Sequence, residues 1–255
     1  MSDVMPLARS PIAPAPPVAV TEGWEVSARR STAALTIIDC TPLTKIQVRA
    51  PIDGPAAAAL GVRFGRAARD ASGTLVVGSG PGEWLLLAGP GQGLDPERIT
   101  APDPSASWVD LTHGRCLIRL NGKSAPTVLA QVCGVDLSDT VTPDGAAFRT
   151  SVAALATDVI RDDLPGAAGA NRDGRPEAVK RAGEAGGGWH AGGSGGVAPP
   201  GSTPSYLLHC ERSSGQYLFD ALLRAGADLG IEIDGFRMPD ALPIRPENQQ
   251  SPQGT

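Results

Sequence analysis

Apolar and polar positions along this chain of 255 residues form short strand-like runs separated by short helix-like runs. The segment 45–50 (KIQVRA) alternates apolar and polar side chains, which is the pattern of a half-buried strand. A short helix follows, with Asp53 as its N-cap and Gly61 at its end. Two further strands, 74–77 and 83–87, are joined by GSGPG, whose glycines supply the positive φ values that a tight hairpin requires.

The same order of elements recurs in the second half of the chain. Residues 108–120 are strand-like, and residues 124–133 carry apolar side chains at helical spacing. Residues 148–160 form more strand, which we expect to pair with 205–210. A final helix begins at Ser213, which forms a capping-box pattern with Gln216. Strand–helix–strand–strand–helix, nearly twice over, predicts an α+β fold of two related plaits.

One long segment interrupts the second unit. Residues 163–204 contain 12 glycines and 5 prolines and few large apolar side chains. Such a segment cannot bury enough apolar surface to offset the entropy lost on ordering its backbone. The sequence therefore predicts a disordered Pro-rich head at 1–34, a first plait at 35–106, a second plait at 107–162 and 205–236, a disordered Gly-rich insertion at 163–204 and a disordered tail at 237–255.

Composition narrows the class of protein. The formal net charge is −5 and the isoelectric point is about 5.2, which argues against a nucleic-acid binder. No run of about 18 apolar residues is present, so we expect no membrane-spanning helix. The four cysteines are far apart, with no CxxC pair. We therefore expect a reduced, cytoplasmic protein without a structural metal.

Few residues suggest chemistry. The glycine-rich run 78–82 is followed by a strand and not by a helix N-terminus, so it indicates a hairpin rather than a phosphate loop. Asp110, His113 and Arg115 form the densest polar cluster, which could be a general acid–base pair or a set of turn-capping groups at a seam between the units. We favour the seam. His209 alternates with apolar neighbours on its strand, and we expect it to face outward or toward a partner.

Aromatic residues mark a candidate interface. Trp84 and Trp108 lie where the sheet of each unit is expected to emerge, and Tyr217 lies near the start of the final helix. Amphipathic aromatic side chains are enriched at interface cores. The alternative is that both tryptophans fill the core between the plaits. In the interface interpretation, Asp110, His113 and Arg115 form a polar seam that orients groups of a partner and performs no chemistry.

Several runs resemble the gamma subunit of heterotetrameric sarcosine oxidase. They are FGRAARD at 64–70, GTLVVGSGPGEWLLLA at 73–88, VDLTHGR at 109–115 and CERSSGQYL at 210–218. The resemblance covers about 35–235 apart from the Gly-rich insertion, which departs from the family.

A more distant resemblance is to the folate-binding aminomethyltransferase of the glycine-cleavage system. Its strand-and-helix pattern is matched by Asp110, Thr112, His113, Gly122 and Ala125. Its functional Asp-Asp pair corresponds to positions 157–158, where one acid is kept as Asp158 and the other is replaced by threonine. This loss argues against independent aminomethyl chemistry.

The resemblance implies a small, non-catalytic subunit of a complex that oxidatively demethylates sarcosine. The products would be glycine, hydrogen peroxide and a one-carbon unit passed to tetrahydrofolate or released as formaldehyde. It also implies alpha, beta and delta partner subunits that carry FAD, FMN and NAD, with no cofactor in this chain. The alternative is a folate-binding one-carbon transfer protein or folate sensor that works alone.

Overall fold

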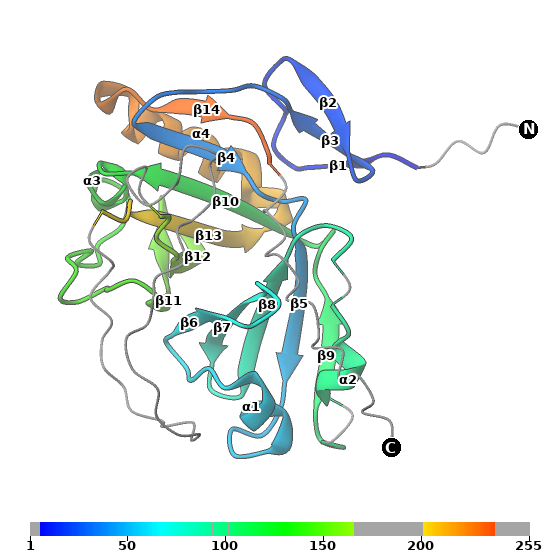
Figure 1. Cartoon of the computed structure of the whole chain (residues 1–255). Helices are drawn as coiled ribbons and strands as arrows, with labels where there is room; N and C mark the ends of the chain where they lie inside the picture. The colour runs from blue at the N-terminus through cyan, green and yellow to red at the C-terminus, as the bar shows by residue number, and fades with distance from the viewer. Residues whose placement is uncertain (1–5, 93, 101–102, 166–200, 238–255) are drawn as a thin grey trace, which may run out of the picture.

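The computed structural model describes residues 6–92, 94–100, 103–165 and 201–237. Two large sheets pack face to face, short helices cover their outer faces, and a small third sheet lies at one end (Figure 1). The strands are β1 (Ala8–Arg9), β2 (Val18–Thr21), β3 (Trp24–Ser27), β4 (Leu35–Asp39), β5 (Thr44–Arg49), β6 (Ala67–Arg69), β7 (Leu75–Gly80), β8 (Glu83–Ala88), β9 (Ser107–Asp110), β10 (Arg115–Gly122), β11 (Ala147–Val152), β12 (Leu155–Arg161), β13 (Ser205–Glu211) and β14 (Glu232–Asp234). The helices are α1 (Pro55–Leu60), α2 (Pro96–Thr100), α3 (Ala125–Ala130) and α4 (Gly215–Ala225), with 3₁₀ turns at Arg212–Ser214 and Ala227–Leu229.

The six-stranded sheet has the order β11-β12-β13-β10-β4-β14. Its outer face is covered by α3 and α4, because alternate strand residues such as Ile118, Leu120 and Leu208 pack against the apolar stripes of these helices. The predicted pairing of the segments on either side of the insertion is confirmed, since Asp158 lies opposite His209 and Arg161 opposite Tyr206.

The five-stranded sheet has the order β6-β7-β8-β5-β9. The predicted hairpin is confirmed as β7 and β8, with Gly82 at a φ of 70° in its turn. Helices α1 and α2 lie on the outer face, where Leu60 packs near Val48 and Trp84. The inner faces of the two sheets meet in a third apolar cluster that includes Leu85, Leu117 and Leu207.

Within the described residues the chain crosses from one large sheet to the other twice, first between β4 and β5 (40–43) and then between β9 and β10 (111–114). These two crossings correct two predicted boundaries. Residues 35–39, predicted in the first plait, form β4, which pairs with β10 in the six-stranded sheet. Residues 107–110, predicted in the second plait, form β9, which pairs with β5 in the five-stranded sheet. Each unit therefore contributes one strand to the sheet of the other. The sequence did not predict this exchange because alternation along a strand does not specify which neighbour the strand pairs with.

The prediction of disorder over 1–34 is wrong for the described part of that segment. Strands β1, β2 and β3 form a small sheet, and Trp24 and Val26 are buried against the cluster between the large sheets. Ile12 is buried in the cluster between the six-stranded sheet and helices α3 and α4. These few large apolar side chains anchor an otherwise proline-rich segment.

The predicted insertion is narrower than 163–204. Leu164 and Thr203 exchange two backbone hydrogen bonds of 3.0 and 2.8 Å. The carboxylate of Asp163 accepts from the guanidinium of Arg161 at 3.0 Å, and its side chain is almost fully buried. The predictions for the rest of the insertion (166–200) and for the tail (238–255) lie outside the described residues.

Two helix starts differ from prediction. Gly54, not Asp53, is the N-cap of α1, although the predicted end at Gly61 is confirmed by its left-handed φ of 63°. Helix α4 begins at Gly215, after a 3₁₀ turn that contains Ser213. The side chain of Gln216 accepts a hydrogen bond from the N–H of Ala13 at 2.8 Å, so it binds the N-terminal segment.

Candidate functional site

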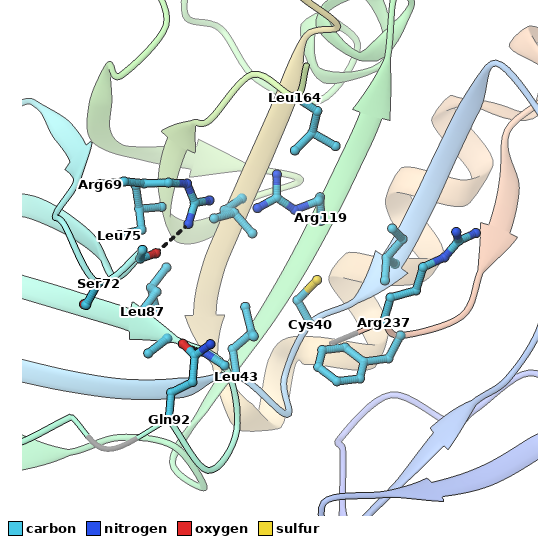
Figure 2. Close-up of a pocket in the computed structure, with 16 residues that line it drawn as sticks. Cys40, Leu43, Arg69, Ser72, Leu75, Leu87, Gln92, Arg119, Leu164 and Arg237 are labelled. Carbon is cyan, nitrogen blue, oxygen red and sulfur yellow. Dashed lines mark hydrogen bonds between the residues drawn. The ribbon is translucent and has the colours of Figure 1, made fainter. Parts of the chain in front are cut away.

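A cavity of about 410 Å³ lies between the inner faces of the two large sheets. Its walls are mostly apolar, and Arg69, Ser72 and Arg119 lie near one another on one side, apart from Gln92 and Arg237 (Figure 2). The apolar walls come from Ile38, Leu43, Leu75, Leu87, Leu207 and Phe236. Gln92 also lines the cavity and accepts a hydrogen bond from the N–H of Gly89 at 3.0 Å. An apolar cavity with a few convergent polar groups is typical of a small-molecule site.

Two arginines approach one another across this cavity, one from each sheet (Figure 2). Arg69 on β6 and Arg119 on β10 both donate to the same carboxylate oxygen of Asp162, at 2.6 and 2.7 Å. Arg237 lies on another side of the cavity and donates to Asp234 at 3.1 Å. Two guanidinium groups share the carboxylate of Asp162, and guanidinium donors of this kind suit an anionic group.

A second cluster of ionisable groups runs across the six-stranded sheet. Arg149, Asp158 and His209 are cross-strand neighbours on β11, β12 and β13. Asp158 accepts from Arg149 Nε at 2.6 Å and lies 3.0 Å from His209 Nδ1. The next residue in this row is Leu117, which packs between the sheets, so the row faces the inner side. None of the three ionisable residues is among those that line the cavity.

The protonation states in this row follow from its partners. Burial opposes the charge on Asp158, but hydrogen bonds from His209 and Arg149 outweigh it and hold the pKa of Asp158 below its usual value. Burial lowers the pKa of His209, and the bond to Asp158 only partly offsets this effect. An ionised carboxylate only accepts, so we assign the proton of neutral His209 to Nδ1. His209 Nε2 is then a buried acceptor without a partner among the described residues.

The expectation that His209 faces outward is therefore wrong: it is only 4% exposed. Alternation along β13 correctly placed His209 on the other face of the sheet from Tyr206, Leu208 and Cys210. His209 is nevertheless buried, because both faces of this sheet are covered. Asp158 is the only predicted site residue in this row.

Lys45 is a buried charged residue that sequence reasoning missed. Its side chain is fully buried, and Nζ donates to the carbonyls of Thr41 and Leu43 at 2.6 and 2.8 Å. Its backbone contacts the second crossing, because its N–H donates to Thr112 Oγ1 and its carbonyl accepts from Leu111. Burial lowers the pKa of Lys45 to about 8. Lys45 thus ties the two crossings together at the seam between the sheets.

The structure separates the two predicted interface tryptophans. Trp84 is 5% exposed and donates from Nε1 to the carbonyl of Val62 at 2.6 Å, so it fills the core. Trp108 is 40% exposed on β9, at the edge of the same sheet. Tyr217 is exposed on α4 and donates to the carbonyl of Ala153 at 3.2 Å.

The predicted polar cluster lies at the second crossing between the sheets. Asp110 caps the turn, since Oδ1 accepts from the N–H of Thr112 at 2.7 Å. The ring of His113 stacks on Trp24, with centroids 4.8 Å apart and planes within 8°. Arg115 pairs with Glu211. Each side chain thus has a partner within this chain, and a role for the cluster at a partner interface stays a prediction.

The described residues offer neither a membrane-spanning helix nor a cluster of metal ligands. No helix in the described ranges is long and apolar enough to cross a membrane. Within the same ranges, no three His, Cys, Asp or Glu side chains are grouped as ligands of a metal ion. All four cysteines are buried free thiols.

Comparison with solved structures defines the class of fold. The chain is similar to a chain of heterotetrameric sarcosine oxidase from Corynebacterium sp. U-96, solved in complex with pyrrole 2-carboxylate, with a TM-score of 0.54 and 22% identity over 79% of this chain and 88% of that chain. It is also similar to glycine cleavage system aminomethyltransferase T from Bartonella henselae, with a TM-score of 0.53 and 14% identity over 86% of this chain and 55% of that chain. These likenesses confirm the predicted α+β, aminomethyltransferase-like fold.

Sequence comparison then identifies the family. No family model matches the chain. The gamma subunit of sarcosine oxidase from Arthrobacter sp. is 34% identical to it over 140 residues, which cover 51% of this chain and 68% of that protein. The chain belongs to the family of sarcosine oxidase gamma subunits.

Proposed function

We propose that this chain is the non-catalytic gamma subunit of a cytoplasmic sarcosine oxidase complex. The complex oxidatively demethylates sarcosine to glycine, releases hydrogen peroxide, and passes the one-carbon unit to tetrahydrofolate or releases it as formaldehyde. The alpha, beta and delta subunits hold FAD, FMN and NAD in this proposal. The observation that carries it is the 34% identity to a sarcosine oxidase gamma subunit along most of that protein's length.

The placement of the ionisable groups supports a non-catalytic role. His209 is buried, the side chain of Asp158 is 12% exposed, and neither residue lines the cavity. A catalytic acid or base must come within hydrogen-bond reach of the substrate proton that it moves. Asp110 and His113 contact Thr112 and Trp24, and they do not contact each other as an acid–base pair.

Co-expression with the other three subunits tests the assignment. We expect this chain to co-purify with them in one peak on size-exclusion chromatography, and the chain alone to show no flavin absorbance and no peroxide release with sarcosine. A yellow isolated chain, or sarcosine-dependent peroxide from the isolated chain, would show that it is catalytic. Failure to co-purify with any of the three subunits would refute the subunit role.

The cavity favours one alternative, a folate-binding protein that works alone. The guanidinium groups of Arg69 and Arg119 fit the glutamate carboxylates of a folate, and the apolar walls fit a planar ring. The lining residues contain no carboxylate to accept from the amino group of a pterin, so the fit covers only part of that ligand.

Titration of the isolated chain with tetrahydrofolate by calorimetry tests this alternative. Binding that is weakened at least tenfold by Arg69→Gln and unchanged by the matched surface variant Arg224→Gln would support it. Arg224 is exposed on α4, away from the cavity lining. No heat of binding with the wild-type chain would leave the subunit role as the function of this fold.

A further inference from the structure

Strand β9 is a short edge strand, with β5 along one edge and helix α2 in contact with it. All four of its residues, Ser107 to Asp110, are exposed, and among the described residues it pairs with β5 alone. Trp108 and Val109 are 40% and 49% exposed and point to opposite faces of the sheet. Natural edge strands are usually protected by shortness, charged side chains, proline, a bulge or a covering segment. Strand β9 is short and carries one charge, Asp110, but it contains no lysine or proline and its register with β5 is regular.

The backbone of β9 presents two residues outward. The N–H of Leu111 donates to the carbonyl of Lys45 at 2.8 Å, so this pair is hydrogen-bonded. Hydrogen-bonded pairs alternate along an antiparallel ladder, which makes Gln47–Val109 the next such pair. The N–H and C=O groups of Trp108 and Asp110 therefore point away from β5, toward the free edge.

The other edges of the two large sheets are tied to neighbouring backbone. Next to β6, the N–H of Ala67 donates to Gly145 at 2.7 Å, and the N–H of Ala147 donates to Gly65 at 3.1 Å. At the end of β14, the N–H of Gly235 donates to Arg29 at 2.8 Å. Among the described residues, no backbone hydrogen bond joins the outer edge of β9 to another segment.

We infer that the outer edge of β9 receives an extended strand from another subunit of the complex, which continues the five-stranded sheet. Outward N–H and C=O groups at alternate residues are the pattern that a strand satisfies and that a helix or a lipid surface does not. This inference rests on the proposed function as a subunit, and it specifies which part of the chain meets a partner.

The side chains of β9 define the chemistry of the incoming strand. Trp108 and Asp110 lie opposite Val48 and Ile46, so both point to the face that carries α1 and α2. Cross-strand pairs are stabilised by apolar contacts and by opposite charges. The partner strand should therefore place an apolar or aromatic side chain beside Trp108 and, two residues away, a lysine or arginine beside Asp110.

Residue-resolved hydrogen exchange of this chain, alone and in the co-expressed four-subunit complex, tests the inference. We expect the amides of Trp108 and Asp110 to exchange rapidly in the free chain and at least tenfold more slowly in the complex. The amide of Val109, which bonds to β5, should be protected in both. Assembly of the complex with unchanged exchange at Trp108 and Asp110 would overturn the inference and leave the subunit role intact. Absence of assembly would refute the subunit role itself.

A pair of variants separates the backbone edge from the indole side chain. Trp108→Ala and Trp108→Pro both remove the indole, but only the proline removes the outward N–H, and neither removes a bond to β5. We expect Trp108→Pro to weaken assembly about tenfold more than Trp108→Ala, the value of roughly one hydrogen bond. Equal effects, with both variants folded by circular dichroism, would contradict strand addition. Self-association of the free chain through β9 would identify a second copy as the occupant and would also contradict it.

Discussion

Trp84 and Trp108 lie in one cross-strand row of the five-stranded sheet, on the same face, with Val48 between them. Trp84 is 5% exposed and Trp108 is 40% exposed. The difference arises because β8 lies inside the sheet, where Leu60 of α1 joins the cluster around Trp84, whereas β9 is the edge strand. One row of the sheet thus contains a core residue and a candidate contact residue.

The first prediction uses this contrast. We expect Trp84→Ala to lower the free energy of unfolding by about 3–5 kcal/mol, because it leaves a cavity and an unpaired carbonyl at Val62. Trp108→Ala should change it by less than about 1 kcal/mol. Urea unfolding of the isolated chain measures both values. A large loss for Trp108→Ala would mean that the edge is covered within the free chain.

The second prediction concerns Lys45 at alkaline pH. Its pKa is lowered by burial from the ordinary value of 10.5 to about 8. Below pH 8 the amine is charged in both states, and between pH 8 and 10.5 the unfolded chain binds the extra proton. The free energy of unfolding should therefore rise with pH in this window, by up to about 3 kcal/mol from this group.

Lys45→Met removes that titration. We expect the difference in unfolding free energy between wild type and Lys45→Met to grow in favour of wild type from pH 8 to 10.5, and to be constant from pH 6 to 7.5. Urea unfolding across both ranges measures it. Parallel curves through pH 10 would show that the pKa of Lys45 is close to its ordinary value.

The third prediction concerns His209 at acidic pH. The folded-state pKa of His209 is lowered by burial, so unfolded chains take up this proton first as the pH falls below about 6.5. Stability should fall by up to about 1.4 kcal/mol per pH unit from this group below that pH. His209→Gln should remove this part of the slope. Urea unfolding of both proteins between pH 4.5 and 7 measures it, and an unchanged slope in His209→Gln would contradict the buried neutral state of His209.

The fourth prediction concerns the insertion. The backbone pair of Leu164 and Thr203 brings the two ends of the segment together. Replacing residues 166–200 by a short Gly-Ser turn should therefore shift the thermal midpoint by less than about 5 °C. Deleting residues 163–204 should lower the thermal midpoint further, because this deletion removes Asp163, which pairs with buried Arg161. Scanning calorimetry of the two deletions compares them, and an equally large loss in both would contradict this boundary.

Local pattern was sufficient for much of the fold. Alternating apolar positions and a glycine-rich turn predicted the β7–β8 hairpin, because both signals lie within a few residues of each other. The pairing of β12 with β13 across the insertion was also predictable, since long loops add little closure entropy. The runs at 73–88 and 109–115 were sufficient to indicate the family.

Tertiary structure alone decided which strand joined which sheet and which charged groups were buried. The pattern of residues 35–39 suits either sheet, and only pairing with β10 places them. Lys45 alternates on its strand like a solvent-facing residue, but two crossings of the chain enclose it. His209 is buried because a second sheet covers its face, and Trp108 is exposed because its strand is the last in its sheet. Sequence periodicity reports which side of an element a residue occupies, whereas its burial depends on what packs against that side.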